Sequence, residues 1–147
     1  MYKKILVPLD GSELAEAVLP HARALAKSEG AEIILLRVPV LPNTAFLARD
    51  PALASIILKD MEEETEDYMK AEVSKRKEEG AKVKGITREG PVTDTILEVA
   101  KEMHADVIAM STHGYSGVQR WLMGSVADRV VHYSPIPVML IHPISQN

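Results

Sequence analysis

Short apolar runs alternate with longer stretches of helical periodicity along this chain, and the alternation restricts its fold more than any other feature. Nearly continuous apolar runs of this length are typical of strands buried on both faces of a sheet. Strands that alternate with helices indicate an α/β protein with a parallel sheet, helices on both faces and right-handed crossovers. A single domain over residues 1–147 is expected from the length. The expected strands are Lys4–Leu9, 33–38, Lys82–Thr87, 107–110 and Val138–Ile141.

The first helix has clear start and stop signals. Ser12 is a favourable N-cap, and Gly30 follows the last residue of the apolar pattern, where a left-handed C-cap is common. Pro20 lies inside the pattern and has no backbone N–H to donate. A kink or the loss of one backbone bond is therefore expected there.

The middle of the chain predicts an irregular connection and then a long helix. Pro39 and Pro42 interrupt residues 39–51, and a connection of this length often covers a ligand. The helix is expected to run from residue 52 or 55 to residue 79, and its charged clusters at 62–64 and 75–77 are typical of a solvated face. Pro91 is expected at the first position of the next helix.

The stretch from residue 107 to residue 125 reads VIAMSTHGYSGVQRWLMGS. Its apolar strand leads into a loop with Gly114 and Gly117. A glycine has no side chain to cover its main-chain amide. Gly124 and Ser125 then open a helical pattern that ends near residue 133, with Ser125 expected as the N-cap. Strand, glycine loop and helix N-terminus in series form an anion cradle. The stretch therefore predicts that this loop holds the phosphates of a nucleotide.

These residues resemble the nucleotide-binding branch of the universal stress protein family. The signature of that family is glycine, two residues, glycine, nine residues, glycine, then serine or threonine. Ser111, Gly114, Gly124 and Ser125 stand at the matching positions, so serine replaces the first glycine. The opening KKILVPLDGSELA and the closing SPIPVMLIH extend the resemblance over nearly the whole chain. It implies a Rossmann-like fold of the adenine nucleotide alpha-hydrolase type, a five-stranded parallel sheet of order 3-2-1-4-5.

A sheet of that order binds ligands beyond the carboxyl ends of its strands, where the order reverses. Asp10 would lie there beside the loop, where its carboxylate accepts bonds from a ribose, an adenine amine or a metal-bound water, or else braces the turn. Val38 resembles the family position whose main chain meets the adenine ring, or is simply a buried strand end. The full set of expected nucleotide-binding residues is Pro8, Leu9, Asp10, Val38, Met110, Ser111, Thr112, His113, Gly114, Gly117, Gly124, Ser125 and Val126.

The expected function is that of a small ATP- or AMP-binding protein that acts as a nucleotide-dependent switch or sensor in stress response, with Mg²⁺ arriving on the phosphates. No catalytic residue is expected, because no lysine lies between Ser111 and Ser125 and the phosphate-loop motif of ATPases is absent. Slow Mg²⁺-dependent hydrolysis stays open as an alternative. So does a nucleotide-free interaction module of the same fold. An NAD-dependent enzyme is disfavoured because the first turn, DGSELA, lacks the G-x-G-x-x-G pattern.

Partners and location follow from the composition and from the resemblance. The net charge of −4 disfavours a nucleic-acid surface, and no apolar run approaches the length of a membrane span. A cytoplasmic protein is expected, with no cysteine chemistry. The histidines lack the i, i+4 spacing of a helical metal site, so no protein-built metal site is expected. The resemblance implies a homodimer through Val138–Ile141, an apolar strand that would otherwise stand exposed at a sheet edge.

Overall fold

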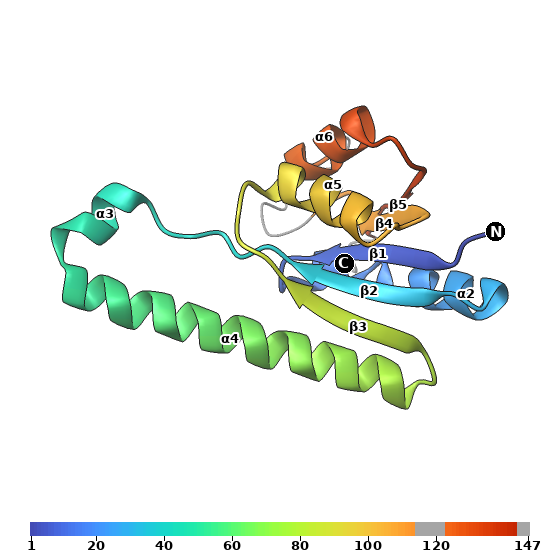
Figure 1. Ribbon diagram of the computed structural model, residues 1–147, viewed down its shortest axis with the longest axis horizontal. Helices are drawn as coiled ribbons and strands as arrows, with labels where there is room; N and C mark the ends of the chain where they lie inside the picture. Colours follow the sequence, from blue (N-terminus) through green and yellow to red (C-terminus); the bar gives the residue numbers. More distant parts are fainter. Residues whose placement is uncertain (114–122, 144–147) are drawn as a thin grey trace.

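The computed structural model describes residues 1–113 and 123–143, which form a parallel sheet covered by helices on both faces (Figure 1). The strand order is β3-β2-β1-β4-β5, and all four pairings are parallel, as predicted. The strands are β1 (Lys4–Leu9), β2 (Glu32–Arg37), β3 (Lys82–Thr87), β4 (Val107–Ser111) and β5 (Val138–Ile141). The helices are α1 (Glu13–Glu16), α2 (Leu19–Glu29), α3 (Thr44–Arg49), α4 (Pro51–Glu78), α5 (Val92–Glu102) and α6 (Ser125–Tyr133).

Two hydrophobic cores form because successive strand residues point to opposite faces of the sheet. Ile5 and Val7 of β1 point to the face covered by α1, α2 and α4, where Met69 of α4 joins them. Leu6 points to the opposite face, where it packs with Ile96 of α5 and with side chains of α6. Burial on both faces explains why the inner strands β1, β2 and β4 are mostly apolar.

The strands β1 and β4 separate soon after they begin to pair. Their register includes only two positions, which end at Leu6 and Ile108. On its other side β1 stays paired with β2 as far as Leu9, which lies opposite Arg37. The sheet therefore opens at the carboxyl ends of β1 and β4, the point where the strand order reverses.

The first helical segment is divided into α1 and α2 before Pro20. Ser12 caps α1 by accepting a hydrogen bond from the Ala15 N–H at 3.1 Å, as predicted. Pro20 lies in the first turn of α2, where its missing N–H costs nothing, so the predicted kink is a complete break. Gly30 ends α2 in the left-handed conformation, with φ of 67°.

The connection at residues 39–51 was expected to be irregular, and this was wrong. It contains α3, which Asn43 caps by accepting a bond from the Ala45 N–H at 2.8 Å. Asp50 then caps α4, which begins at Pro51, one residue before the earlier of the two predicted starts. Figure 1 shows α3 and the first turns of α4 extending past the sheet.

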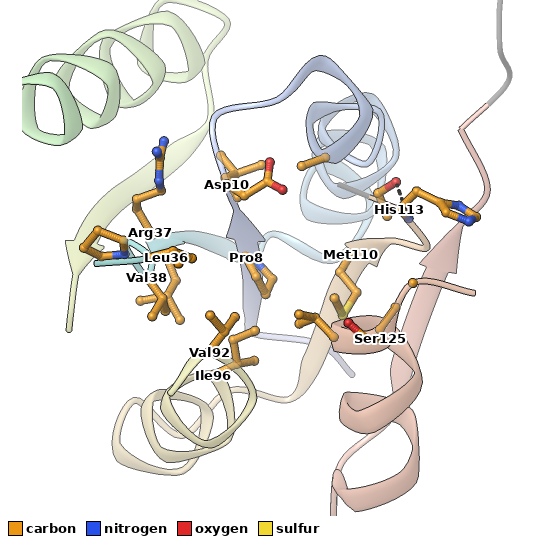
Figure 2. Close-up of a pocket in the computed structure, with 18 of the residues that line it drawn as sticks. Pro8, Asp10, Leu36, Arg37, Val38, Val92, Ile96, Met110, His113 and Ser125 are labelled. Atoms are coloured by element: carbon orange, nitrogen blue, oxygen red, sulfur yellow. Dashed lines mark hydrogen bonds between the residues drawn. The ribbon is translucent and has the colours of Figure 1, made fainter. Parts of the chain in front are cut away.

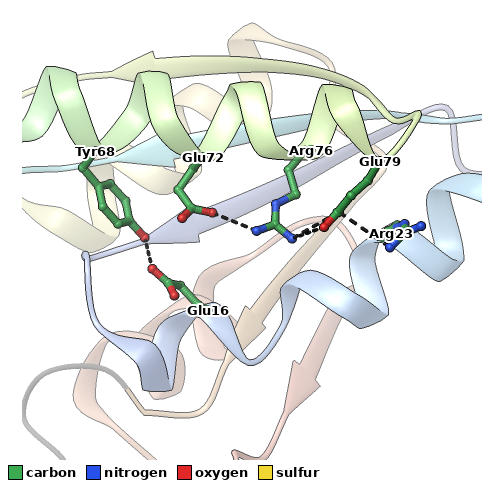
Figure 3. A network of polar contacts seen from close by, with 6 residues as sticks. All are labelled: Glu16, Arg23, Tyr68, Glu72, Arg76 and Glu79. Carbon is green, nitrogen blue, oxygen red and sulfur yellow. Dashed lines mark hydrogen bonds and ion pairs between the residues drawn. The ribbon is translucent and has the colours of Figure 1, made fainter.

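A polar network holds α4 against the first two helices (Figure 3). The Tyr68 hydroxyl donates to Glu16 of α1 at 2.7 Å. Arg76 pairs with Glu72 at 3.2 Å and with Glu79 at 3.3 Å, and it is 8% exposed. The expectation of a fully solvated face at residues 75–77 is therefore wrong for Arg76, because its charge is balanced by two carboxylates as it becomes buried.

The helix α5 begins one residue later than predicted. Pro91 is its N-cap, and Val92 is its first helical residue.

Within residues 1–113 and 123–143, no helix has both the length and the apolar character that a membrane crossing requires.

Candidate functional site

A cavity of about 400 Å³ lies where the sheet opens, at the carboxyl ends of β1, β2 and β4. This volume falls in the range of small-molecule and cofactor pockets. The structure brings together on its wall eleven of the predicted site residues, from segments more than a hundred positions apart in the sequence. They are Pro8, Leu9, Asp10, Val38, Met110, Ser111, Thr112, His113, Gly124, Ser125 and Val126. The predicted residues Gly114 and Gly117 lie outside the described part of the chain.

One end of the cavity is apolar (Figure 2). Its side chains come from the end of β2 and from the first turns of α5, and most are buried. They are Leu36, Val38, Val92 and Ile96, whereas Met110 lies beside Ser125. Val38 lies one residue beyond the end of β2, so its main chain is outside the regular ladder. An apolar wall beside an irregular main-chain segment suits a flat ring that needs both burial and a few hydrogen bonds.

Asp10 stands on the polar side of the cavity, at the turn after β1 (Figure 2). Its Oδ1 accepts hydrogen bonds from the Ser12 amide at 2.9 Å and from the Ser12 hydroxyl at 2.6 Å. The bracing role that the sequence left open is therefore present. It also orients the carboxylate at the cavity wall, so bracing and ligand binding are compatible.

The N-terminus of α6 forms another part of the wall. Gly124 is its N-cap, and within residues 1–113 and 123–143 no side chain makes a capping hydrogen bond there. Ser125 was expected as the N-cap and is instead the first helical residue, with an exposed side chain. The amides of this first turn are thus left for a ligand or for water, in a position that favours anions.

The φ of Gly124, −58°, is open to any residue, so the backbone conformation does not require glycine here. Glycine is required because the Thr112 carbonyl approaches the position of a Cβ closely. The Gly124 N–H donates to the Thr112 carbonyl at 2.7 Å, which ties α6 to the end of β4. A Cβ at this position would lie 2.8 Å from the same carbonyl oxygen. A side chain here would therefore push the start of α6 away from the cavity.

His113 is buried, with 8% of its surface exposed, and it braces the end of β4. The Thr112 hydroxyl lies 2.9 Å from Nδ1 of His113 and 3.1 Å from Nδ1 of His142. The hydroxyl has one proton and can donate to only one of these nitrogens, and the tautomer of each ring decides which groups donate. Ser111 adds a contact, since its Oγ accepts from the His113 amide at 3.4 Å. These contacts fix the end of β4 against the end of β5.

Comparison with known proteins agrees with this geometry. The sequence model of the universal stress protein family matches residues 1–142. This chain belongs to that family. A universal stress protein of Methanocaldococcus jannaschii, MJ0531, is 35% identical to it, over 96% of this chain and 82% of the relative.

Two solved structures extend the comparison of this universal stress protein. The MJ0577 protein of M. jannaschii superimposes with a TM-score of 0.86 at 30% identity, over 99% of each chain. A universal stress protein from Archaeoglobus fulgidus, solved in complex with dAMP, has a TM-score of 0.66 at 24% identity, over 95% of this chain and 98% of the other. The five-stranded Rossmann-like fold of the family is therefore the fold of this chain.

The sequence prediction missed several parts of this site, among them Met61, Glu64 and Thr65 of α4. The apolar end depends on Val92 and Ile96 of α5, whose spacing is the same as that of ordinary core residues. Arg37 also lines the cavity, and its signal was a single charged residue inside an apolar run. Among the described residues, no three histidine, aspartate or glutamate side chains come together as a metal site.

Proposed function

We propose that this universal stress protein binds an adenine nucleotide, ATP or AMP, and acts as a nucleotide-dependent switch or sensor in stress response. The supporting observation is one cavity that joins an apolar end to the uncapped N-terminus of α6. Adenine suits the apolar end and phosphates suit the amides. Asp10 lies on the wall between them, within reach of a ribose, and the main chain of Val38 lies at the apolar end, within reach of a base.

The comparisons support the same class of ligand. The A. fulgidus protein is solved in complex with dAMP, and it has the same fold. Mg²⁺ would be bound through the oxygens of the phosphates, because small hard cations prefer oxygen ligands supplied partly by the substrate. The glycine positions 114 and 117 would complete the phosphate contacts.

Two measurements test the proposal. The purified protein is denatured, and the supernatant is run on an anion-exchange column to detect a released adenine nucleotide. The melting temperature of nucleotide-free protein is then followed with ATP, AMP, adenosine and tripolyphosphate. Binding at one hundred times the dissociation constant stabilises the fold by about 2.7 kcal/mol. We expect ATP or AMP to raise the melting temperature more than adenosine or tripolyphosphate, since each of these fills only part of the cavity.

A melting temperature unchanged at millimolar ATP, with no released nucleotide, would refute the proposal and favour an interaction module. Turnover is expected to be slow. Arg37, one of the described cavity residues, ends β2 and is away from the start of α6. Its guanidinium therefore does not neutralise charge on the proposed phosphates. Release of phosphate from ATP with Mg²⁺, measured in single-turnover experiments, tests this part separately.

We also propose a homodimer through β5, Val138–Ile141. This strand is at one edge of the sheet, and its four side chains are only half buried. An apolar edge strand with unpaired main-chain groups favours pairing with a second copy. Sedimentation equilibrium should give twice the chain mass of 16.2 kDa, and a single-chain mass at micromolar concentration would refute the dimer.

A further inference from the structure

Arg37 is the last residue of β2 and one of the residues that line the cavity, and its side chain extends away from Leu36 and Val38 (Figure 2). The residue is 8% exposed. Its Nη1 is inaccessible to solvent and has no hydrogen-bond partner among the described residues. Leaving a buried donor of a charged group unpaired costs free energy. An anion that accepts from Nη1 would remove this cost, and the described residues supply none.

Two contacts hold the guanidinium in place. It lies over the ring of Tyr68, with its central carbon 5.1 Å from the ring centre. On its other side Nη1 packs against Gly11, where a Cβ would lie only 2.5 Å away. The φ of Gly11 is +88°, which also favours glycine. The turn after Asp10 thus leaves space for the guanidinium, and Tyr68 holds it from the opposite side.

The strand order places this cation away from the proposed phosphate site. β2 and β4 lie on opposite sides of β1, and α6 begins beyond β4. A nucleotide that reaches from Val38 to Gly124 would carry its ribose beside Asp10, which is the residue before Gly11. The 5′-phosphates would then lie toward α6, and the 2′ and 3′ positions of the ribose would lie toward Arg37.

We propose that Arg37 binds a phosphate carried on the 2′ or 3′ oxygen of the ribose. The preferred ligand would then be an adenosine nucleotide phosphorylated at the 5′ position and at one of these two. This inference rests on the proposed adenine nucleotide site. The planar guanidinium matches a phosphate with two parallel hydrogen bonds, and an arginine beside the ribose of a Rossmann-type site accommodates a 2′-phosphate in the same way.

The carboxylate of Asp10 opposes such a phosphate only weakly. Its Oδ1 already accepts two hydrogen bonds from Ser12, at 2.9 and 2.6 Å, which offset part of its negative charge. To meet an anion in the cavity, the guanidinium would leave Gly11 by rotation of its side-chain torsions, and Nη1 is the far end of that side chain. An anion on the ribose would then accept a hydrogen bond from Nη1 of Arg37, which otherwise has no partner among the described residues.

Isothermal titration with three probes tests this inference. They are AMP, adenosine 2′,5′-bisphosphate and adenosine 3′,5′-bisphosphate, each titrated into nucleotide-free wild type and into Arg37→Gln. Arg88→Gln is the matched control, since Arg88 follows β3 as Arg37 ends β2 and its side chain pairs with Glu102. We expect one bisphosphate to bind wild type at least about tenfold more tightly than AMP, the gain typical of one charged hydrogen bond. Arg37→Gln should lose this advantage and keep its affinity for AMP, whereas Arg88→Gln should keep both.

The outcomes separate this inference from the proposed function. If AMP binds and neither bisphosphate binds more tightly, the role of Arg37 is refuted and the nucleotide site stands. If none of the three binds, both are refuted. Equal loss of affinity for all probes in Arg37→Gln would mean a structural role, and Arg37→Lys replaces this variant if it does not fold. Without ligand, the melting temperature of Arg37→Gln should be unchanged or higher, and a fall of several degrees would also overturn the inference.

Discussion

Substitution of Gly124 by alanine tests whether the first turn of α6 holds the phosphates. The new Cβ would lie 2.8 Å from the Thr112 carbonyl oxygen, and an ordinary contact begins at 3.4 Å, so the two groups must separate by 0.6 Å. The hydrogen bond from the Gly124 N–H to this oxygen starts at 2.7 Å. The same displacement lengthens it to about 3.3 Å, beyond the usual range.

The expected cost has two parts. Overpacking against a backbone atom costs about 1–3 kcal/mol, and weakening the hydrogen bond up to about 1 kcal/mol more. Because the amides of α6 move with Gly124, phosphate contacts worth about 1.5–3 kcal/mol are disturbed, which corresponds to a loss of affinity of roughly tenfold to a hundredfold. Urea unfolding measures the first effect, and calorimetric titration with ATP measures the second.

Gly85→Ala is the matched control. A Cβ at Gly85 meets only the ends of flexible side chains, Val73 Cγ2 at 3.0 Å and Met69 Cε at 3.4 Å, on β3 and away from the cavity. This variant should bind ATP as wild type does. If Gly124→Ala keeps its fold and also binds ATP as wild type does, the amides of α6 do not hold the phosphates.

Three further predictions concern a hydroxyl and two ionisable groups. Ser125→Ala should change ATP affinity by less than about threefold, because we expect main-chain amides to hold the phosphates, and a larger loss in the titration would assign that role to the hydroxyl. Hydrogen bonds from two backbone amides lower the pKa of Asp106, so its contribution to stability is present above an ordinary aspartate pKa of about 4 and lost as pH falls. Melting temperatures from about pH 6 to about pH 3 should therefore fall less steeply in Asp106→Asn than in wild type. Burial, and then the hydrogen bond to Glu16, raise the pKa of Tyr68, so stability should fall as pH rises above about 10, and Tyr68→Phe should reduce that fall.

Local signals predicted the strands well, because the inner strands β1, β2 and β4 are buried on both faces and read as apolar runs. The bounds of β1, β3 and β5 agree with the sequence-based expectation. The helix α3 was missed because its six residues bury no side chain, so no apolar stripe marks it. Its one signal was Asn43 as a cap, a residue equally typical of a turn.

The candidate site also has parts that the local sequence predicts and parts that it does not. Gly124 and the segment at 110–113 could be placed from motif spacing, because a strand, a loop and a helix start are adjacent in the sequence. The contact of Thr112 with His142 could not, since it depends on the pairing of β4 with β5. The space between Gly11 and Tyr68 that receives Arg37 is likewise a property of the packed chain and not of any one segment.

The topology connects these observations. Because β1 pairs with β2 to its end and with β4 over only two positions, the cavity opens on one side of β1 and keeps a closed wall on the other. The uncapped helix lies beyond the open side, and the buried guanidinium of Arg37 lies at the end of the closed wall. A ligand with one phosphate reaches only the helix and leaves Nη1 of Arg37 unpaired. A ligand that binds both the start of α6 and Arg37 needs negative charge on either side of its ribose. The comparison of AMP with the bisphosphates therefore separates the contribution of α6 from that of Arg37.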